Sequence, residues 1–128
     1  MATYSKQLLS TSTEGEPTLS TSTSAGSPTT IHDTTTTATT IDELWLYCSN
    51  SHSADVELIL FYGYDSAGSV PTAPANTLYQ TITTKAGMTL VCAGLILVND
   101  GSNATRVSAY SATGSVLNLW GYVNRITA

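Results

Sequence analysis

The two histidines of the chain are the side chains best suited to bind a metal or to move a proton. His32 is followed by Asp33, and His52 lies three residues before Asp55, so each could join a His/carboxylate metal cluster. The histidines are twenty residues apart, however, and neither belongs to an H-x-H or H-E-x-x-H motif. Because both lie in polar, turn-like sequence, we interpret them as solvated loop histidines or local caps.

Asp55 and Glu57 are the carboxylates whose spacing most suggests chemistry. Residues two apart on a strand share a face, which would bring these groups within about 7 Å of each other. A pair at that distance could serve a glycosidase or hold calcium, so a hydrolase acting through Asp55 and Glu57 is one alternative function. A charged strand face that keeps the protein soluble is the more common reason for such a pair.

Other signatures of catalysis are missing from the sequence. No G-x-S-x-G, G-x-G-x-x-G or phosphate-binding loop occurs. Asn99-Asp100-Gly101-Ser102-Asn103 carries oxygens as a calcium loop does, but it lacks the remaining ligands and predicts a tight turn. Cys48 and Cys92 form no C-x-x-C motif and are expected to be reduced core residues, although their pairing stays open. The sequence predicts a protein that is not an enzyme and that uses no cofactor or metal.

The composition excludes several classes of partner. The 128 residues include four basic and nine acidic side chains, a formal charge of −5, and only 10% are charged. A chain with so few cations lacks the basic surface that binds nucleic acid or an anionic membrane. No apolar run approaches the roughly 18 residues of a transmembrane helix. The 23 threonines and 16 serines indicate a surface hydrated by hydroxyl groups instead of by charge.

The chain divides into two parts by composition. Residues 1–40 hold 21 of the 39 hydroxyl residues and few large apolar side chains, so they cannot form a core of their own. Threonine favours extended backbone, however. We therefore predict an extended Ser/Thr-rich N-terminal arm over residues 1–40, which lies along its own domain or along a neighbouring copy, and a β-sandwich domain over residues 41–128.

Alternating apolar residues predict the strands of the second part. Leu44, Leu46 and Cys48 share one face of their strand, whereas Trp45 and Tyr47 share the other. Roughly seven or eight such strands separated by turns are typical of an antiparallel sandwich of jelly-roll or immunoglobulin-like type, and we favour the jelly roll slightly. A loop is expected at Val70–Ala75, and the strands at Ile41–Asn50, Asp55–Tyr64, Leu78–Thr84, Met88–Ala93 with Leu95–Val98, Thr105–Ser111 and Val116–Ile126.

Aromatic residues follow the predicted strands closely. Trp45 with Tyr47 and Trp120 with Tyr122 repeat the same spacing, each pair opposite an aliphatic face. Such rings could pack within the chain, form a subunit interface, or make a platform for sugars. We expect some of them to face a second layer, which in a domain of this size could be another subunit. Packing within one chain is the favoured of the three alternatives.

The chain also contains several strand patterns in a fixed order. They are Lys6 to Ser10, Thr30-Ile31-His32, Asp42-Glu43-Leu44-Trp45-Leu46-Tyr47 with Asn50, Ala54-Asp55-Val56-Glu57-Leu58, and Gly121 to Ile126. In this order they resemble a group of small structural proteins from tailed bacteriophages. The resemblance extends over most of the chain, but its motifs describe strands, so it transfers no functional residue. The Ser/Thr-rich stretch between Pro17 and Thr29 departs from the pattern and leaves the binding partner of the arm open.

The resemblance implies a structural component of the virion, encoded among the head genes and assembled in the host cytoplasm. It favours a capsid decoration or cement protein on the capsid surface, whose partners would be the major capsid protein and further copies of the chain, as a homotrimer. A virion-surface adhesin, or a head-fibre or tail module that binds host glycans, is the alternative. The candidate interface residues are Lys6, Leu8, Leu9, Leu19, Ile31, Trp45, Tyr47, Trp120 and Tyr122.

Overall fold

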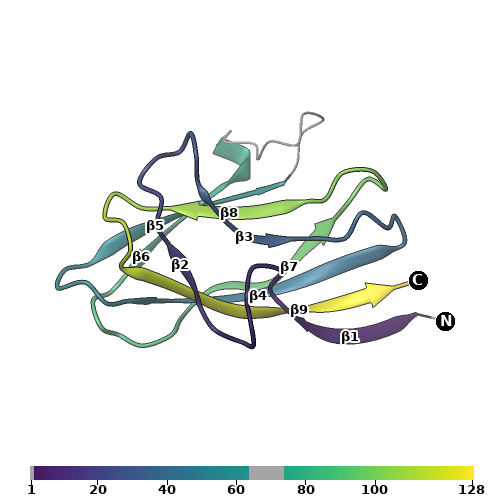
Figure 1. The fold of residues 1–128 in the computed structure, drawn as a ribbon, viewed down its shortest axis with the longest axis horizontal. Helices are drawn as coiled ribbons and strands as arrows, with labels where there is room; N and C mark the ends of the chain where they lie inside the picture. The colour runs from purple at the N-terminus through teal and green to yellow at the C-terminus, as the bar shows by residue number, and fades with distance from the viewer. Residues whose placement is uncertain (1, 64–73) are drawn as a thin grey trace.

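The computed structural model describes residues 2–63 and 74–128. Figure 1 shows two layers of strands, and every strand pair in them is antiparallel. The fold is therefore an all-β sandwich of a five-stranded and a four-stranded sheet, which confirms the predicted fold class at this level. The described residues contain one short 3-10 turn, η1 (Pro74–Asn76), and no helix long and apolar enough to span a membrane.

The five-stranded sheet contains β1 (Thr3–Leu8), β2 (Thr18–Ser20), β4 (Thr40–Asn50), β7 (Thr89–Val98) and β9 (Leu117–Thr127). Its order is β1-β9-β4-β7, and β2 also pairs with β9. β1 lies along one half of β9 and β2 along the other half, so the two short strands share one edge of the sheet. β4 and β9 pair over their whole length and form the centre of the sheet.

The four-stranded sheet contains β3 (Thr29–Asp33), β5 (Val56–Gly63), β6 (Thr77–Ile82) and β8 (Arg106–Tyr110). Its order is β3-β8-β5-β6. The five-stranded sheet places the two ends of the chain side by side, because β1 pairs with β9 (Figure 1).

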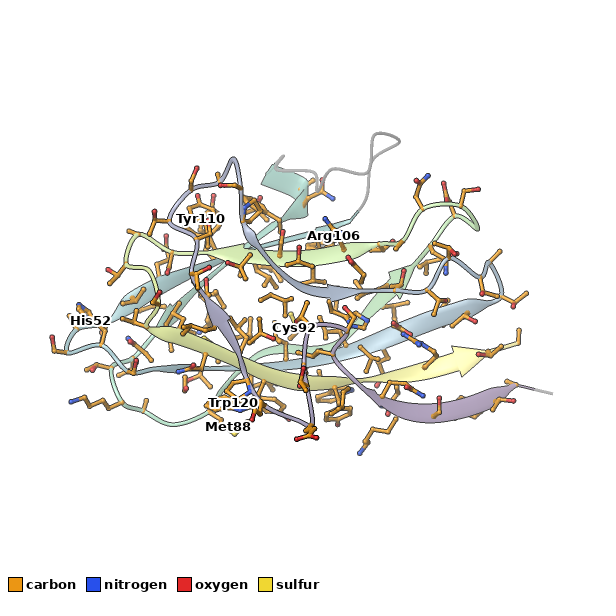
Figure 2. The ribbon with its side chains drawn as sticks, in the orientation of Figure 1. His52, Met88, Cys92, Arg106, Tyr110 and Trp120 are labelled. Atoms are coloured by element: carbon orange, nitrogen blue, oxygen red, sulfur yellow. The ribbon has the colours of Figure 1, made fainter. Side chains whose placement is uncertain are left out.

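The core lies between the sheets and follows the predicted alternation. Leu44, Leu46 and Cys48 are fully buried, whereas Trp45 and Tyr47 on the same strand are only partly buried. Figure 2 shows Cys92 between the layers and Trp120 on the outer side of the five-stranded sheet. The core members are Leu9, Ile31, Leu44, Leu46, Cys48, Val56, Leu58, Leu60, Ile82, Cys92, Leu97, Val107, Ala109, Leu117, Leu119 and Val123.

The strand predictions for residues 41–128 agree with the structure to within two residues at most ends. The two predicted segments around Gly94 form one strand, β7, with an irregularity of register beside Gly94, whose φ of 82° suits glycine. The Asn99–Asn103 turn is confirmed, since the Asp100 carboxylate accepts hydrogen bonds from the backbone N–H groups of Ser102 and Asn103. Most of the predicted Val70–Ala75 loop lies outside the described residues.

Residues 1–40 contribute three strands to the sandwich. β1 and β2 pair with β9, and β3 is an edge strand of the four-stranded sheet that pairs with β8. The sequence leaves two partners open for these residues, their own domain and a neighbouring copy. In the structure they pair with strands of their own chain. β3 also carries core residues, because Ile31 and His32 are fully buried.

Candidate interaction surface

The five-stranded sheet turns one face toward the four-stranded sheet and the other face outward. Paired residues of an antiparallel ladder point to the same side of a sheet. The register therefore places Leu8, Tyr122 and Trp45 in one row of the outward face, although the three come from β1, β9 and β4. We call this side the outer face, and its apolar members are Tyr4, Leu8, Leu19, Ile41, Trp45, Tyr47, Leu90, Ile96, Val98, Trp120, Tyr122 and Ile126.

The two edges of the outer face are its most exposed parts. On β1, Tyr4 is 71% exposed and Leu8 is 50% exposed. On β7, the exposed fractions of Leu90, Ile96 and Val98 are 45%, 49% and 53%. Because monomeric proteins rarely expose a large continuous apolar surface, the outer face is the candidate interaction surface of this chain.

Aromatic rings form the middle of the outer face. Trp45 and Tyr122 lie on neighbouring strands with their ring planes 10° apart and their centroids at 6.5 Å. The Lys6 ammonium lies 4.5 Å from the centroid of the Tyr122 ring, so a cation already occupies one side of that ring. Figure 2 shows Trp120 and Met88 on this side of the sandwich, opposite Tyr110 and Arg106.

The polar groups among these rings bind one another. The Trp45 indole N–H donates to Glu43 Oε1 at 2.6 Å, and the Asn124 amide donates to the same oxygen at 3.2 Å. These two hydrogen bonds lower the pKa of Glu43 below its ordinary value. The outer face therefore offers a partner mainly apolar surface around Trp45, because the Glu43 carboxylate and the Trp45 indole N–H already bind within the chain.

The structure brings most of the predicted interface residues together on this face. Two of the candidates, Leu9 and Ile31, lie elsewhere: their exposed fractions are 2% and 0%, and both belong to the core. Both side chains pack inside the sandwich and neither lies on the outer face, which corrects their expected place on an exposed surface. The candidates on the outer face are Lys6, Leu8, Leu19, Trp45, Tyr47, Trp120 and Tyr122.

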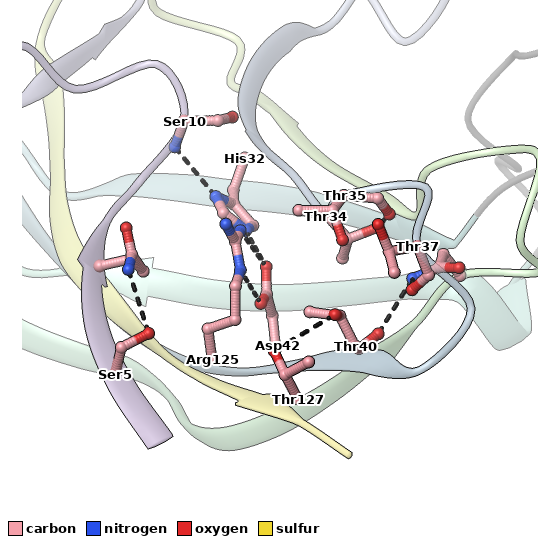
Figure 3. Close-up of polar contacts among 12 residues, drawn as sticks. Ser5, Ser10, His32, Thr34, Thr35, Thr37, Thr40, Asp42, Arg125 and Thr127 are labelled. Atoms are coloured by element: carbon pink, nitrogen blue, oxygen red, sulfur yellow. Dashed lines mark hydrogen bonds and ion pairs between the residues drawn. The ribbon is translucent and has the colours of Figure 1, made fainter. Parts of the chain in front are cut away.

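A second group of polar residues lies inside the sandwich (Figure 3). The Ser10 backbone N–H donates to His32 Nδ1 at 2.9 Å, so this nitrogen carries no proton. His32 Nε2 then holds the ring proton and donates to Asp42 Oδ2 at 2.8 Å. Arg125 donates to both oxygens of Asp42, at 2.8 Å from Nε and 3.0 Å from Nη2. The cluster connects the N-terminal segment, β3, β4 and β9.

The burial of His32 and Asp42 keeps these two side chains of the cluster away from any molecule in solution. His32 and Asp42 are both completely buried, so neither can contact a substrate. Burial acts to raise the pKa of Asp42, but hydrogen bonds and charges from Arg125 and His32 outweigh it and hold this pKa at about 2. Asp42 therefore stays ionised and ties the two sheets together. The expectation of a solvated loop histidine is wrong for His32, which lies on a strand in the core.

The remaining candidates for chemistry lie outside this buried cluster. Asp55 and Glu57 are exposed, and Asp55 accepts a hydrogen bond from the Thr84 backbone N–H at 3.0 Å. The His52 backbone N–H donates to the Asn50 side chain at 2.8 Å. No group of three or more His, Cys, Asp or Glu residues within this part of the chain could hold a metal ion.

The two cysteines are free thiols in the core. Burial raises the pKa of Cys48 to about 12 and that of Cys92 to about 11. Both stay protonated at neutral pH, so they behave as small apolar side chains. This answers the open question of their pairing: they do not form a disulfide.

Comparisons of this chain with protein-family models, curated proteins and solved structures give no significant match.

Proposed function

We propose that this chain is a structural protein of a tailed-bacteriophage virion that decorates the capsid and strengthens it by adhesion. The observation that carries the proposal is the outer face, an apolar surface that extends across all five strands of one sheet. Because β1 and β2 follow the same edge of β9, the face is four strands wide. At about 4.8 Å per strand and roughly 33 Å along the long strands, it covers on the order of 600 Å². This is close to the roughly 800 Å² that each partner contributes to a stable interface.

We further propose that the sandwich is a jelly roll. Four of its strand pairs support this: β2 with β9, β3 with β8, β4 with β7, and β5 with β6. Pairs of this kind arise when one long hairpin is rolled up, so that its two arms alternate between two sheets. Eight-stranded jelly rolls of this type are common in viral capsid proteins and in lectins.

The proposed partners are the major capsid protein and further copies of this chain, on the surface of the virion. A homotrimer suits positions of three-fold symmetry in a shell. Each contact can be weak, because many contacts act together in a closed lattice. We propose that the outer face contacts the shell and that no nucleic acid or membrane takes part.

Glycan binding by a surface adhesin or a head-fibre or tail module is the second candidate, because tryptophan and tyrosine rings are present on the outer face. Sugars need free polar groups beside such rings to fix their hydroxyl groups. On this face Glu43, Asn124 and the Trp45 indole bind each other, and Lys6 covers one side of Tyr122. This arrangement favours a protein partner.

Co-sedimentation with capsids tests the proposal. Heads assembled from the major capsid protein of the same genome should bind the chain. The substitution Ile96→Asp, on the outer face, should weaken this binding at least tenfold, because it places a charge in an apolar contact. Tyr79→Asp is the matched control, since Tyr79 is 64% exposed on the outward side of the other sheet, on edge strand β6.

Two results would count against capsid decoration. The first is an absence of binding to the heads by the unaltered chain. The second is equal weakening by Ile96→Asp and Tyr79→Asp, which would show that the outer face is not the contact. Binding to a glycan array that Ile96→Asp abolishes, together with no binding to heads, would favour the adhesin.

A further inference from the structure

The first strand is attached to the sandwich without contributing to its core. All six residues of β1 are exposed, and β9 is its only strand partner among the described residues. We propose that β1 exchanges between copies of this chain, so that residues 3–10 of one copy occupy the β9 edge of another. The proposal deepens the proposed assembly function by naming a second copy as the partner of this edge.

The segment between β1 and β2 has the features of a hinge. β1 and β2 follow the same edge of β9, one after the other, and residues 9–17 leave that edge and return to it. Within this excursion Glu14 has a φ of 56° and Gly15 a φ of 84°. The left-handed conformation is unfavourable for a residue with a side chain, so the closed turn stores strain at Glu14. Extension of the hinge in an exchanged form would release this strain.

The hinge is long enough to carry β1 away from its own sheet. Residues 11–17 can span roughly 23 Å when extended. β1 could therefore leave the β9 edge of its own copy and reach a neighbour whose β9 edge lies within that distance. Short hinges under strain favour such domain swapping.

The docking site for residues 3–10 is specific to this sequence. Leu9 fills a place in the core, and the Ser10 backbone N–H donates to His32 Nδ1. The Ser10 hydroxyl accepts a hydrogen bond from the Asp33 backbone N–H at 2.7 Å, and Lys6 lies over Tyr122. A strand from another protein would lack this combination of contacts, whereas a second copy of the chain reproduces all of it. A second copy is therefore the partner that the site favours.

Only a few contributions to the free energy differ between the closed form and the exchanged form. The docked segment makes the same contacts in both, since each copy offers an identical site. The closed form retains the strain at Glu14. The exchanged form loses the hydrogen bonds inside the hinge, in which the Glu16 backbone N–H donates to the Thr13 carbonyl and the Ser12 hydroxyl donates to the Glu16 carbonyl, and it loses the freedom of separate molecules. The fraction of exchanged chains should therefore rise with the protein concentration.

A designed disulfide between β1 and β9 tests the exchange directly. Tyr4 and Ile126 are cross-strand partners, so the double variant Tyr4→Cys/Ile126→Cys places two thiols opposite each other. After refolding at high protein concentration and oxidation, a non-reducing denaturing gel should show covalent multiples of the 13.4 kDa chain. The share of these multiples should rise with the concentration at refolding. The single variants Tyr4→Cys and Ile126→Cys measure random cross-linking, because Cys48 and Cys92 are buried.

Glu14→Gly provides a second test that needs no added cysteine. Glycine adopts a positive φ without strain, so this change stabilises the closed form. Native mass spectrometry should show an exchanged fraction about fivefold lower than in the unaltered chain. Exchange is refuted if the double-cysteine variant yields only an internally cross-linked monomer at every concentration, or if the unaltered chain and Glu14→Gly are equally monomeric. Because these experiments contain no capsid, failure to bind heads would not affect their result.

Discussion

His32 and Asp42 connect the two sheets of the sandwich through one buried hydrogen bond. The Nε2 atom of His32, on β3, donates to Oδ2 of Asp42, on β4, at 2.8 Å, and both side chains are fully excluded from solvent. Arg125 on β9 binds the same carboxylate with two hydrogen bonds. The carboxylate is thus the centre of a network whose loss would leave a buried histidine and a partly buried guanidinium without their partner.

The chain contains a second Asp–Arg pair, so the contribution of the buried network to stability can be compared with that of a more exposed pair. Asp42→Asn should lower the free energy of unfolding by about 3 kcal/mol, because it breaks a buried ion pair and leaves its partners unsatisfied. Asp33 binds Arg106 with the same two-bond geometry, but the side chains of this pair are 33% and 40% exposed. Asp33→Asn should therefore cost about 1 kcal/mol or less. Urea unfolding of both variants measures the difference, and equal losses would contradict the assigned role of burial.

Stability should fall in acid because of Asp42. Its pKa in the folded chain is about 2, against an ordinary value of 3.8. A lowered pKa contributes stability above pH 3.8, and this contribution is lost as the pH falls toward 2. The loss should amount to about 2 kcal/mol.

Urea unfolding between pH 6 and pH 2 measures this dependence, and Asp42→Asn is its control. The variant has no carboxyl group at this position, so its stability should decline less steeply over the same range. Parallel curves for the variant and the unaltered chain would show that other carboxylates cause the acid sensitivity.

The strands of residues 41–128 could be predicted because the pattern that specifies each strand lies within its own short stretch of sequence. Leu44 and Leu46 alternate with Trp45 and Tyr47, and this period of two specifies both the strand and its buried face. The same period predicts that Trp45 and Tyr47 lie on the face of the sheet opposite the core, where the structure places them. Leu9 and Ile31 were misplaced because nothing local tells a core contact from an interface when both are apolar.

His32 could not be assigned from the sequence because its partners are distant in the chain. Asp42 is ten residues away and Ser10 is 22 residues away, and Arg125 joins the cluster only through the pairing of β4 with β9. His32 lies between Ile31 and Asp33 in a threonine-rich stretch, and so polar a stretch has the composition of a loop. The one signal in the sequence is the extended preference of the surrounding threonines, which is compatible with an extended arm as well as with a buried strand.

Gly121 should tolerate no side chain. A Cβ atom at this position would lie 2.1 Å from the Trp45 carbonyl oxygen, on the central strand pair β4 and β9. Gly121→Ala should therefore destabilise the fold by about 3 kcal/mol or prevent the two strands from pairing. Gly26→Ala is the control, because its Cβ would meet only the Ser24 hydroxyl oxygen at 3.5 Å, and thermal unfolding should change little. A stable Gly121→Ala variant would show that β4 and β9 are further apart than described.

Two deletions should separate the exposed part of the N-terminal segment from its buried part. Removal of residues 2–8 takes away β1, which is exposed throughout, so the remaining chain should keep its near-ultraviolet circular dichroism and lose only about 1 kcal/mol of stability. Removal of residues 2–40 takes away β3, whose Ile31 and His32 are fully buried, and it leaves Asp42 without one of its donors. This longer deletion should abolish cooperative unfolding. A cooperatively folded chain lacking residues 2–40 would show that β3 is dispensable and that the sandwich begins at β4.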